Sequence, residues 1–210
     1  MKLQPLTIAV CAGLLWAGTL GAQDPAKPAK PGDKTPPAMS AEEKAMMEAW
    51  QKFATPAEGH QKLAGMVGTW DAEVTSWMNP AGPPLKSMGT SENHWVLGNR
   101  WIEQRFHGKF MDQPFEGIGY TGYDNYKKKY VGTWMDNMST AVMMSEGAFD
   151  AAGKSMTSMS TMDDFMTGRQ QKIRTVVNVV DNDRHVFEMY GPGPDGKDAK
   201  QMEIVYKRRN

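Results

Sequence analysis

Residues 68–78 read GTWDAEVTSWM, and this stretch carries the signal that decides the fold. From Trp70 to Thr75 an apolar side chain alternates with a polar one, which is the period of a strand that buries one face. Similar runs recur at the spacing of antiparallel meanders, at 86–96, 100–110, 115–123, 129–136, 141–149, 154–162, 170–180, 184–190 and 200–207. The sequence therefore predicts about ten strands.

Turn residues separate these runs, as at Gly98-Asn99, Asp124-Asn125 and Asp181-Asn182. No segment between the runs is long enough for a crossover helix, which excludes a parallel sheet. An antiparallel sheet of ten strands leaves two unpaired edges unless it closes on itself. The pattern therefore predicts a mainly β fold, a single antiparallel up-and-down barrel preceded by one or two short helices.

Two helix starts precede the first strand. Ser40 and Glu43 have the spacing of a capping box, and Pro56 stands where a second helix would begin. After Ser40 an apolar stripe at helical spacing consists of Met46, Met47, Trp50 and Phe53. The second helix ends before Gly68, and we expect the pair to lie across one end of the barrel.

The N-terminus has the layout of a cleaved secretory signal. Lys2 precedes an apolar run at 6–20, and the small residues Gly21 and Ala22 follow it. The run is too short and too broken by glycine for a bilayer span, which needs roughly 20 residues. We expect a signal peptide at 1–22, a Pro/Ala/Lys-rich linker at 23–39, the helices at 40–66 and the barrel at 67–210. The mature chain is then periplasmic or secreted and has no membrane span.

Composition excludes several function classes. The chain has 24 basic and 24 acidic residues, so no basic excess favours a nucleic-acid partner. Its single cysteine, Cys11, excludes an internal disulfide and a zinc ribbon. The histidines lack metal-site spacing, and neither a nucleophile elbow nor a phosphate loop is present. We therefore assign no catalytic and no metal-binding residue, while an enzyme whose residues converge only in three dimensions stays open.

Methionine is the compositional anomaly, with 18 residues. Soft thioethers bind Cu(I). In the run 155–162, however, alternation would point Met156 and Met162 to one side and Met159 to the other, which separates the sulfurs. We interpret the methionines instead as flexible residues that line an irregular barrel interior.

Two resemblances support a barrel. Gly68-Thr69-Trp70 resembles the start of lipocalin-like (calycin) barrels, which implies that Arg208 or Arg209 stacks on the tryptophan. Four segments between residues 56 and 207 resemble the bacterial family known as domain of unknown function 1579: PAEGHQKLAGMVGTW, FEGIGYTGYDNYKKKYVGTWMDNMST, SEGAFD and HVFEMYGPGPDGK. That family implies no catalytic residues.

A barrel of this size can enclose one small ligand. We predict an apolar ligand, and strand alternation selects its lining residues as Ile102, Phe106, Tyr120, Trp134, Met144, Phe187, Met202 and Ile204. Glu146 is either a polar group that orients the ligand or an exposed acid, and His185 is the histidine predicted to face the interior. No cofactor is required by this prediction.

Two alternatives stay open. Similarity to nitrobindin barrels implies haem, with His185 as the axial candidate. The other is a structural or interaction protein whose interior is fully packed. The sequence carries no signal for an oligomeric state.

Overall fold

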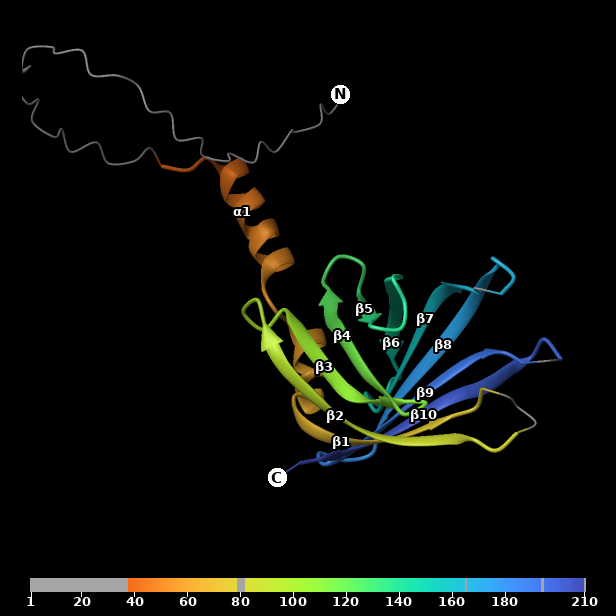
Figure 1. The fold of residues 1–210 in the computed structure, drawn as a ribbon. Coiled ribbons are helices and arrows are strands. Elements are labelled where there is room, and N and C mark those ends of the chain that lie inside the picture. The colour runs from red at the N-terminus through yellow and green to blue at the C-terminus, as the bar shows by residue number, and fades with distance from the viewer. Residues whose placement is uncertain (1–37, 79–81, 165, 194, 210) are drawn as a thin grey trace, which may run out of the picture. The chain divides into compact units, whose positions relative to one another are not determined.

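The computed structural model describes residues 38–78, 82–164, 166–193 and 195–209. The expected signal peptide and the linker up to residue 37 lie outside the described residues. Residues 40–210 form one compact unit. Its strands build a closed barrel in which each strand pairs antiparallel with its neighbour in the chain and β10 closes onto β1 (Figure 1). The predicted mainly β, up-and-down barrel is confirmed.

The barrel follows two helices and a 3-10 turn. The elements are α1 (Ala41–Ala54), α2 (Glu58–Gln61), η1 (Ala64–Met66), β1 (Gly68–Ser76), β2 (Leu85–Val96), β3 (Trp101–Phe110), β4 (Gln113–Asp124), β5 (Lys129–Asp136), β6 (Met143–Phe149), β7 (Ser155–Asp163), β8 (Gln170–Val179), β9 (Arg184–Pro192) and β10 (Asp198–Arg208). None of the described helices is long and apolar enough to cross a membrane.

Helix α1 begins at the predicted capping box. The Ser40 hydroxyl accepts a hydrogen bond from the Glu43 amide at 3.2 Å, and the Glu43 carboxylate accepts one from the Ser40 amide at 2.8 Å. At its other end, Arg100 Nε donates to the Ala54 carbonyl at 3.0 Å, and Asn125 Nδ2 donates to the Phe53 carbonyl at 2.9 Å. No residue of α1 is buried. The expectation that both helices cover an end of the barrel is therefore wrong for α1.

The segment after α1 does close one end of the barrel. Leu63, between α2 and η1, is fully buried and joins Ile102, Tyr130 and Met156 in one core cluster. Tyr130 Oη also donates a hydrogen bond to the Gly59 carbonyl at 3.0 Å. Apolar burial and a hydrogen bond thus fix this short segment to the strands.

Trp70 stands at the same end and confirms the implied stacking. The ring is fully buried, and Arg208 Cζ lies 4.1 Å from its centroid. The Arg208 guanidinium also donates to the Val67 carbonyl at 2.8 Å. Gly68 has φ +134°, and a Cβ there would collide with this guanidinium, so the position needs glycine. Arg209 pairs instead with Asp71.

Candidate functional site

The inner face of the barrel gathers half of the predicted ligand residues into one apolar cluster. Phe106 and Ile204 are buried there with Trp70 and its neighbours. Five partly buried residues pack against this core: Val74, Phe115, Trp134, Phe187 and Met202. We call these five the inner apolar ring. Phe106, Trp134, Phe187 and Met202 therefore meet, although they come from β3, β5, β9 and β10.

Strand register fixes the direction of these side chains. Ile204 pairs with Phe187, and Gly119 pairs with Trp134, so each pair lies on one face of the sheet. Because the ring residues point inward and still keep solvent-accessible surface, the core does not enclose them completely. This part of the inner face therefore presents apolar surface that the core does not cover.

Polar groups are also placed on the inner face. Trp134 Nε1 donates to Asp136 Oδ2 at 3.0 Å, and Gln104 Nε2 donates to Ser91 Oγ at 2.9 Å. Ser160 on β7 pairs in register with the fully buried Ile173, which places its side chain inward. Its hydroxyl is buried and has no hydrogen-bond partner within the described part of the chain. Its oxygen is closed to solvent, so a ligand can bond to this hydroxyl only when neighbouring side chains move.

His185 lies at the closed end of the same face. Its ring stacks on Tyr206 at 4.5 Å between centroids and meets Trp70 edge-on at 4.3 Å. Burial lowers the pKa of His185 to about 4, and the positive charge of Arg208 adds to that effect. The imidazole is therefore neutral near pH 7.

The surroundings of His185 decide whether it can serve as the axial ligand of a haem iron. Only 6% of the residue is exposed, and aromatic rings cover it. An axial ligand must present a ring nitrogen to an iron that sits in a large flat macrocycle. The packing beside His185 leaves no such approach, so these residues do not fit haem.

Three of the predicted lining residues lie on the outer face instead. Met144 is 68% exposed and pairs with Thr133, whereas its neighbour Met143 pairs with the inward-facing Trp134. Glu146 lies two positions after Met144 and shares its outward direction. The interior placement expected for Met144 and Tyr120 is therefore wrong, and of the two alternatives for Glu146 the exposed acid is the one that the structure has.

The case of Tyr120 has a clear physical reason. The inward positions of β4 include Gly117 and Gly119, and a Cβ at either one would collide with the ring of Trp134. The glycines make room for this tryptophan, so the bulky residues of that part of β4 face outward. There Tyr120 Oη donates to Glu103 Oε2 at 2.8 Å, and this hydrogen bond raises the pKa of Tyr120.

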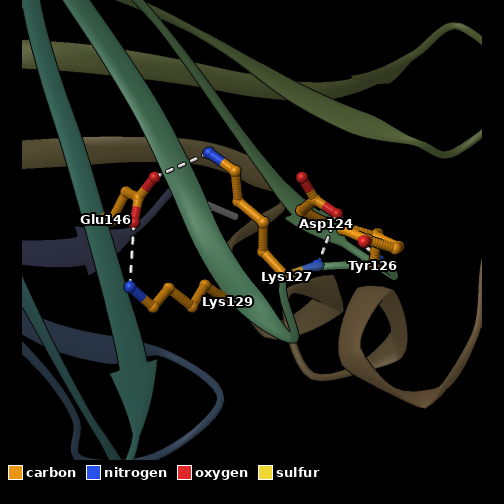
Figure 2. A network of polar contacts seen from close by, with 5 residues as sticks. All are labelled: Asp124, Tyr126, Lys127, Lys129 and Glu146. Atoms are coloured by element: carbon orange, nitrogen blue, oxygen red, sulfur yellow. Dashed lines mark hydrogen bonds and ion pairs between the residues drawn. The ribbon is translucent and has the colours of Figure 1, made fainter.

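Glu146 belongs to an ionic network on the outer face (Figure 2). Lys127 Nζ lies 2.8 Å from its Oε1 and Lys129 Nζ lies 2.9 Å from its Oε2. Hydrogen bonds from Lys127 and then Lys129 lower the pKa of Glu146 to about 2. Asp124 stabilises the turn between β4 and β5, which carries Lys127, because its carboxylate accepts a hydrogen bond from the Lys127 amide at 2.9 Å.

This network borders an open groove of about 1200 Å³, which we call the outer groove. Trp50 and Phe53 of α1 line one side, and the outer face of β5–β7 lines the other with Val131, Met144 and Met159. Sequence reasoning found the apolar stripe of α1 but gave no sign that it would border a groove.

The methionines do not gather as expected. Of the 17 methionines that the structure describes, 12 are exposed, so most of them do not line the interior. Met156 and Met159 do differ in direction, because Met156 is in the core and Met159 is 46% exposed. Among the described residues, no group of three His, Cys, Asp or Glu side chains could hold a metal ion.

Comparison with known proteins gives a family and a fold. The family model described as "Protein of unknown function (DUF1579)" matches residues 55–208. No curated protein matches the chain.

Several solved structures are similar, and two of them are described here. The crystal structure of Rv2717c from M. tuberculosis has a TM-score of 0.56 and 11% identity, over 74% of this chain and 100% of that one. A redesigned β-barrel, b11L5F_LGL, has a TM-score of 0.37 and 13% identity, over 75% of this chain and 100% of that one, which is too low to carry an argument. At 11% identity, the likeness to Rv2717c concerns the fold alone.

Proposed function

Since the chain belongs to the DUF1579 family, a family of unknown function, we propose its role from the inner face: it is a binding protein for a small apolar molecule. The ligand contacts the inner apolar ring, whose residues pack against the buried core residues Phe106 and Ile204. It enters from the end of the barrel opposite Leu63 and Trp70.

One observation carries this proposal. The five ring residues point into the barrel, yet each stays only partly buried. Fully burying an aromatic or large aliphatic side chain contributes about 1.5–3 kcal/mol relative to exposure, so a ligand that covers the ring gains affinity from each contact. Ligand sites of this kind combine apolar walls with a few polar groups.

Ser160 supplies such a polar group. Its hydroxyl is buried on the inner face and lacks a partner among the described residues. We therefore propose a ligand with an apolar body and one hydrogen-bonding group. Neither ion pairs nor a metal are needed for this recognition.

Export is part of the proposal. It rests on Lys2, the apolar run at 6–20 and the small residues Gly21 and Ala22. Intact-mass measurement of the native protein should find a chain that starts near Gln23. A chain that retains residues 1–22 would contradict export with cleavage.

The binding test uses one substitution at two positions. Met202 belongs to the inner ring, and Met144 is 68% exposed on the outer face. Replacing Met202 by Gln places an amide against the ligand without a partner, which typically costs about 1–3 kcal/mol. We expect Met202→Gln to weaken binding of an apolar fluorescent dye by about tenfold or more. Met144→Gln, the matched control, should leave the affinity unchanged.

Other results would redirect the proposal. If no apolar dye binds the wild type, the inner face is a packed core and the protein is structural. If Met144→Gln weakens binding and Met202→Gln does not, the dye lies in the outer groove. A Soret band in the purified protein would contradict the argument against haem.

A further inference from the structure

The apolar stripe of α1 is uncovered. Its four residues, Met46, Met47, Trp50 and Phe53, are 59%, 44%, 60% and 51% exposed. An isolated helix of 14 residues is only marginally stable in water, because most helical stability in proteins comes from packing an apolar face. The stripe therefore has the composition of a contact surface, with aromatic residues and methionine at helical spacing.

The stripe continues into the outer groove. Trp50 and Phe53 line the groove together with Met144 and Met159 from the strands. Met46 and Met47 do not line it, although Met46 is only about 10 Å along the helix from Phe53. A small molecule in the groove would leave this first half of the stripe exposed. A second helix laid along α1 covers both halves.

Charge favours the α1 helix of another copy as that second helix. The groove lining contains four cations, Arg100, Lys127, Lys129 and Lys172, and two carboxylates, Asp124 and Glu146, which gives +2. Helix α1 contains Glu42, Glu43 and Glu48 against Lys44 and Lys52, which gives −1. The acidic residues Glu42 and Glu43 stand in its first turn.

If the α1 helices of two copies cross antiparallel, the acidic end of each helix meets the basic groove of the other copy. This crossing places the acidic first turn of one α1 beside the last turn of the other, where Lys52 and the basic groove lie. The same excess of acid on α1 opposes adsorption to an anionic membrane, for which interfacial helices carry lysine and arginine.

We propose that two copies of this chain form a twofold-symmetric dimer through α1. Each α1 packs antiparallel on the stripe of the other copy and reaches the other outer groove with its acidic first turn. The contact is self-complementary, as a twofold interface requires, because stripe and groove belong to the same molecule. Hydrogen bonds from Arg100 and Asn125 to the end of α1 hold the stripe at the mouth of the groove.

Sedimentation velocity of the full chain, as purified from its host, tests the proposal by measuring the fraction of dimer. The protein concentration is varied between about 1 and about 200 μM, a range that spans the dissociation constants typical of weak homodimers. We expect a concentration-dependent dimer. The double variant Trp50→Ser, Phe53→Ser should dimerise at least about 30-fold more weakly, since central aromatic residues dominate such interfaces. Both side chains are more than half exposed, so the melting temperature of the barrel should stay the same.

Two further variants sharpen the result. Met88→Ser is the matched control, because Met88 is 61% exposed on β2 and away from both stripe and groove. It should dimerise as the wild type does. Glu42→Lys reverses a charge of the first turn that is not part of the capping box, and it should weaken the dimer most at low salt.

Three results would overturn the proposal. The first is a wild type that stays monomeric over the whole range. The second is a dimer that the double variant leaves intact, which would place the interface elsewhere. The third is a monomer that binds vesicles of phosphatidylglycerol through Trp50 and Phe53, which would assign the stripe to a membrane surface. None of these results changes the expected binding of dye to the inner face.

Discussion

Replacing His185 should remove a large part of the acid sensitivity of the barrel. The imidazole lies between Trp70 and Tyr206 and is 6% exposed. Burial first, and the Arg208 charge second, lower the pKa of His185 from 6.5 to about 4. The folded protein therefore holds the neutral ring at pH values where the unfolded chain has already bound a proton.

The sign and size of the effect follow from that difference. Between pH 6.5 and pH 4 the unfolded state binds more protons at this position, so stability falls as the pH falls through this window. Below both pKa values the loss amounts to about 3 kcal/mol, and at pH 5 it has reached about 2 kcal/mol. A typical domain is stable by only about 5–15 kcal/mol, so the effect is measurable.

Urea denaturation of the wild type and of His185→Phe at pH 7.5, 6 and 5 measures this contribution. Between pH 7.5 and pH 5 we expect the variant to lose about 2 kcal/mol less of its free energy of unfolding than the wild type. His185→Gln provides a second variant that cannot titrate, in case phenylalanine fits poorly. Parallel pH profiles of the wild type and both His185 variants would refute the reasoning.

Three smaller predictions concern the core and the inner face. Trp70→Ala should lower the free energy of unfolding by about 3–5 kcal/mol, measured by urea denaturation, because the fully buried ring is lost. Gly119→Ala should destabilise by about 1–3 kcal/mol in the same assay, since its Cβ would lie 2.9 Å from the ring of Trp134. Ser160→Ala should raise the melting temperature slightly by removing an unpaired buried hydroxyl, and should lower the affinity for a ligand that bonds to it. A ligand affinity unchanged by Ser160→Ala would remove that serine from the site.

The sequence predicted the fold because each of its signals is local. The alternation in residues 68–78 and the turn residues between later runs determine strands and hairpins without reference to distant parts of the chain. Closure then follows from the need to pair the sheet edges. The contact of Trp70 with Arg208 joins the first strand to the last, and only the resemblance to calycins anticipated it.

The site was predicted in part, because alternation separates two faces but does not say which one is inside. On β6, Met143 and Met144 are adjacent apolar residues, and the sequence alone gave no means to choose between them. On β4, the inward face carries glycines that the ring of Trp134 covers. The facing pair of Gly119 and Trp134 is a signal that could have corrected the choice, because a glycine opposite a tryptophan marks the side where the ring lies.

The ionisable groups with the largest pKa shifts titrate far from neutral pH. A general acid or base works best with a pKa near the working pH. In the part of the chain that the structure describes, every group with a shifted pKa moves away from neutrality: burial lowers the pKa of His185 to about 4, hydrogen bonds lower that of Glu146 to about 2, and burial raises that of Tyr130 to about 12. The inner ring adds apolar surface that is partly exposed and no ionisable side chain. Such a face can hold a molecule by burial and one hydrogen bond.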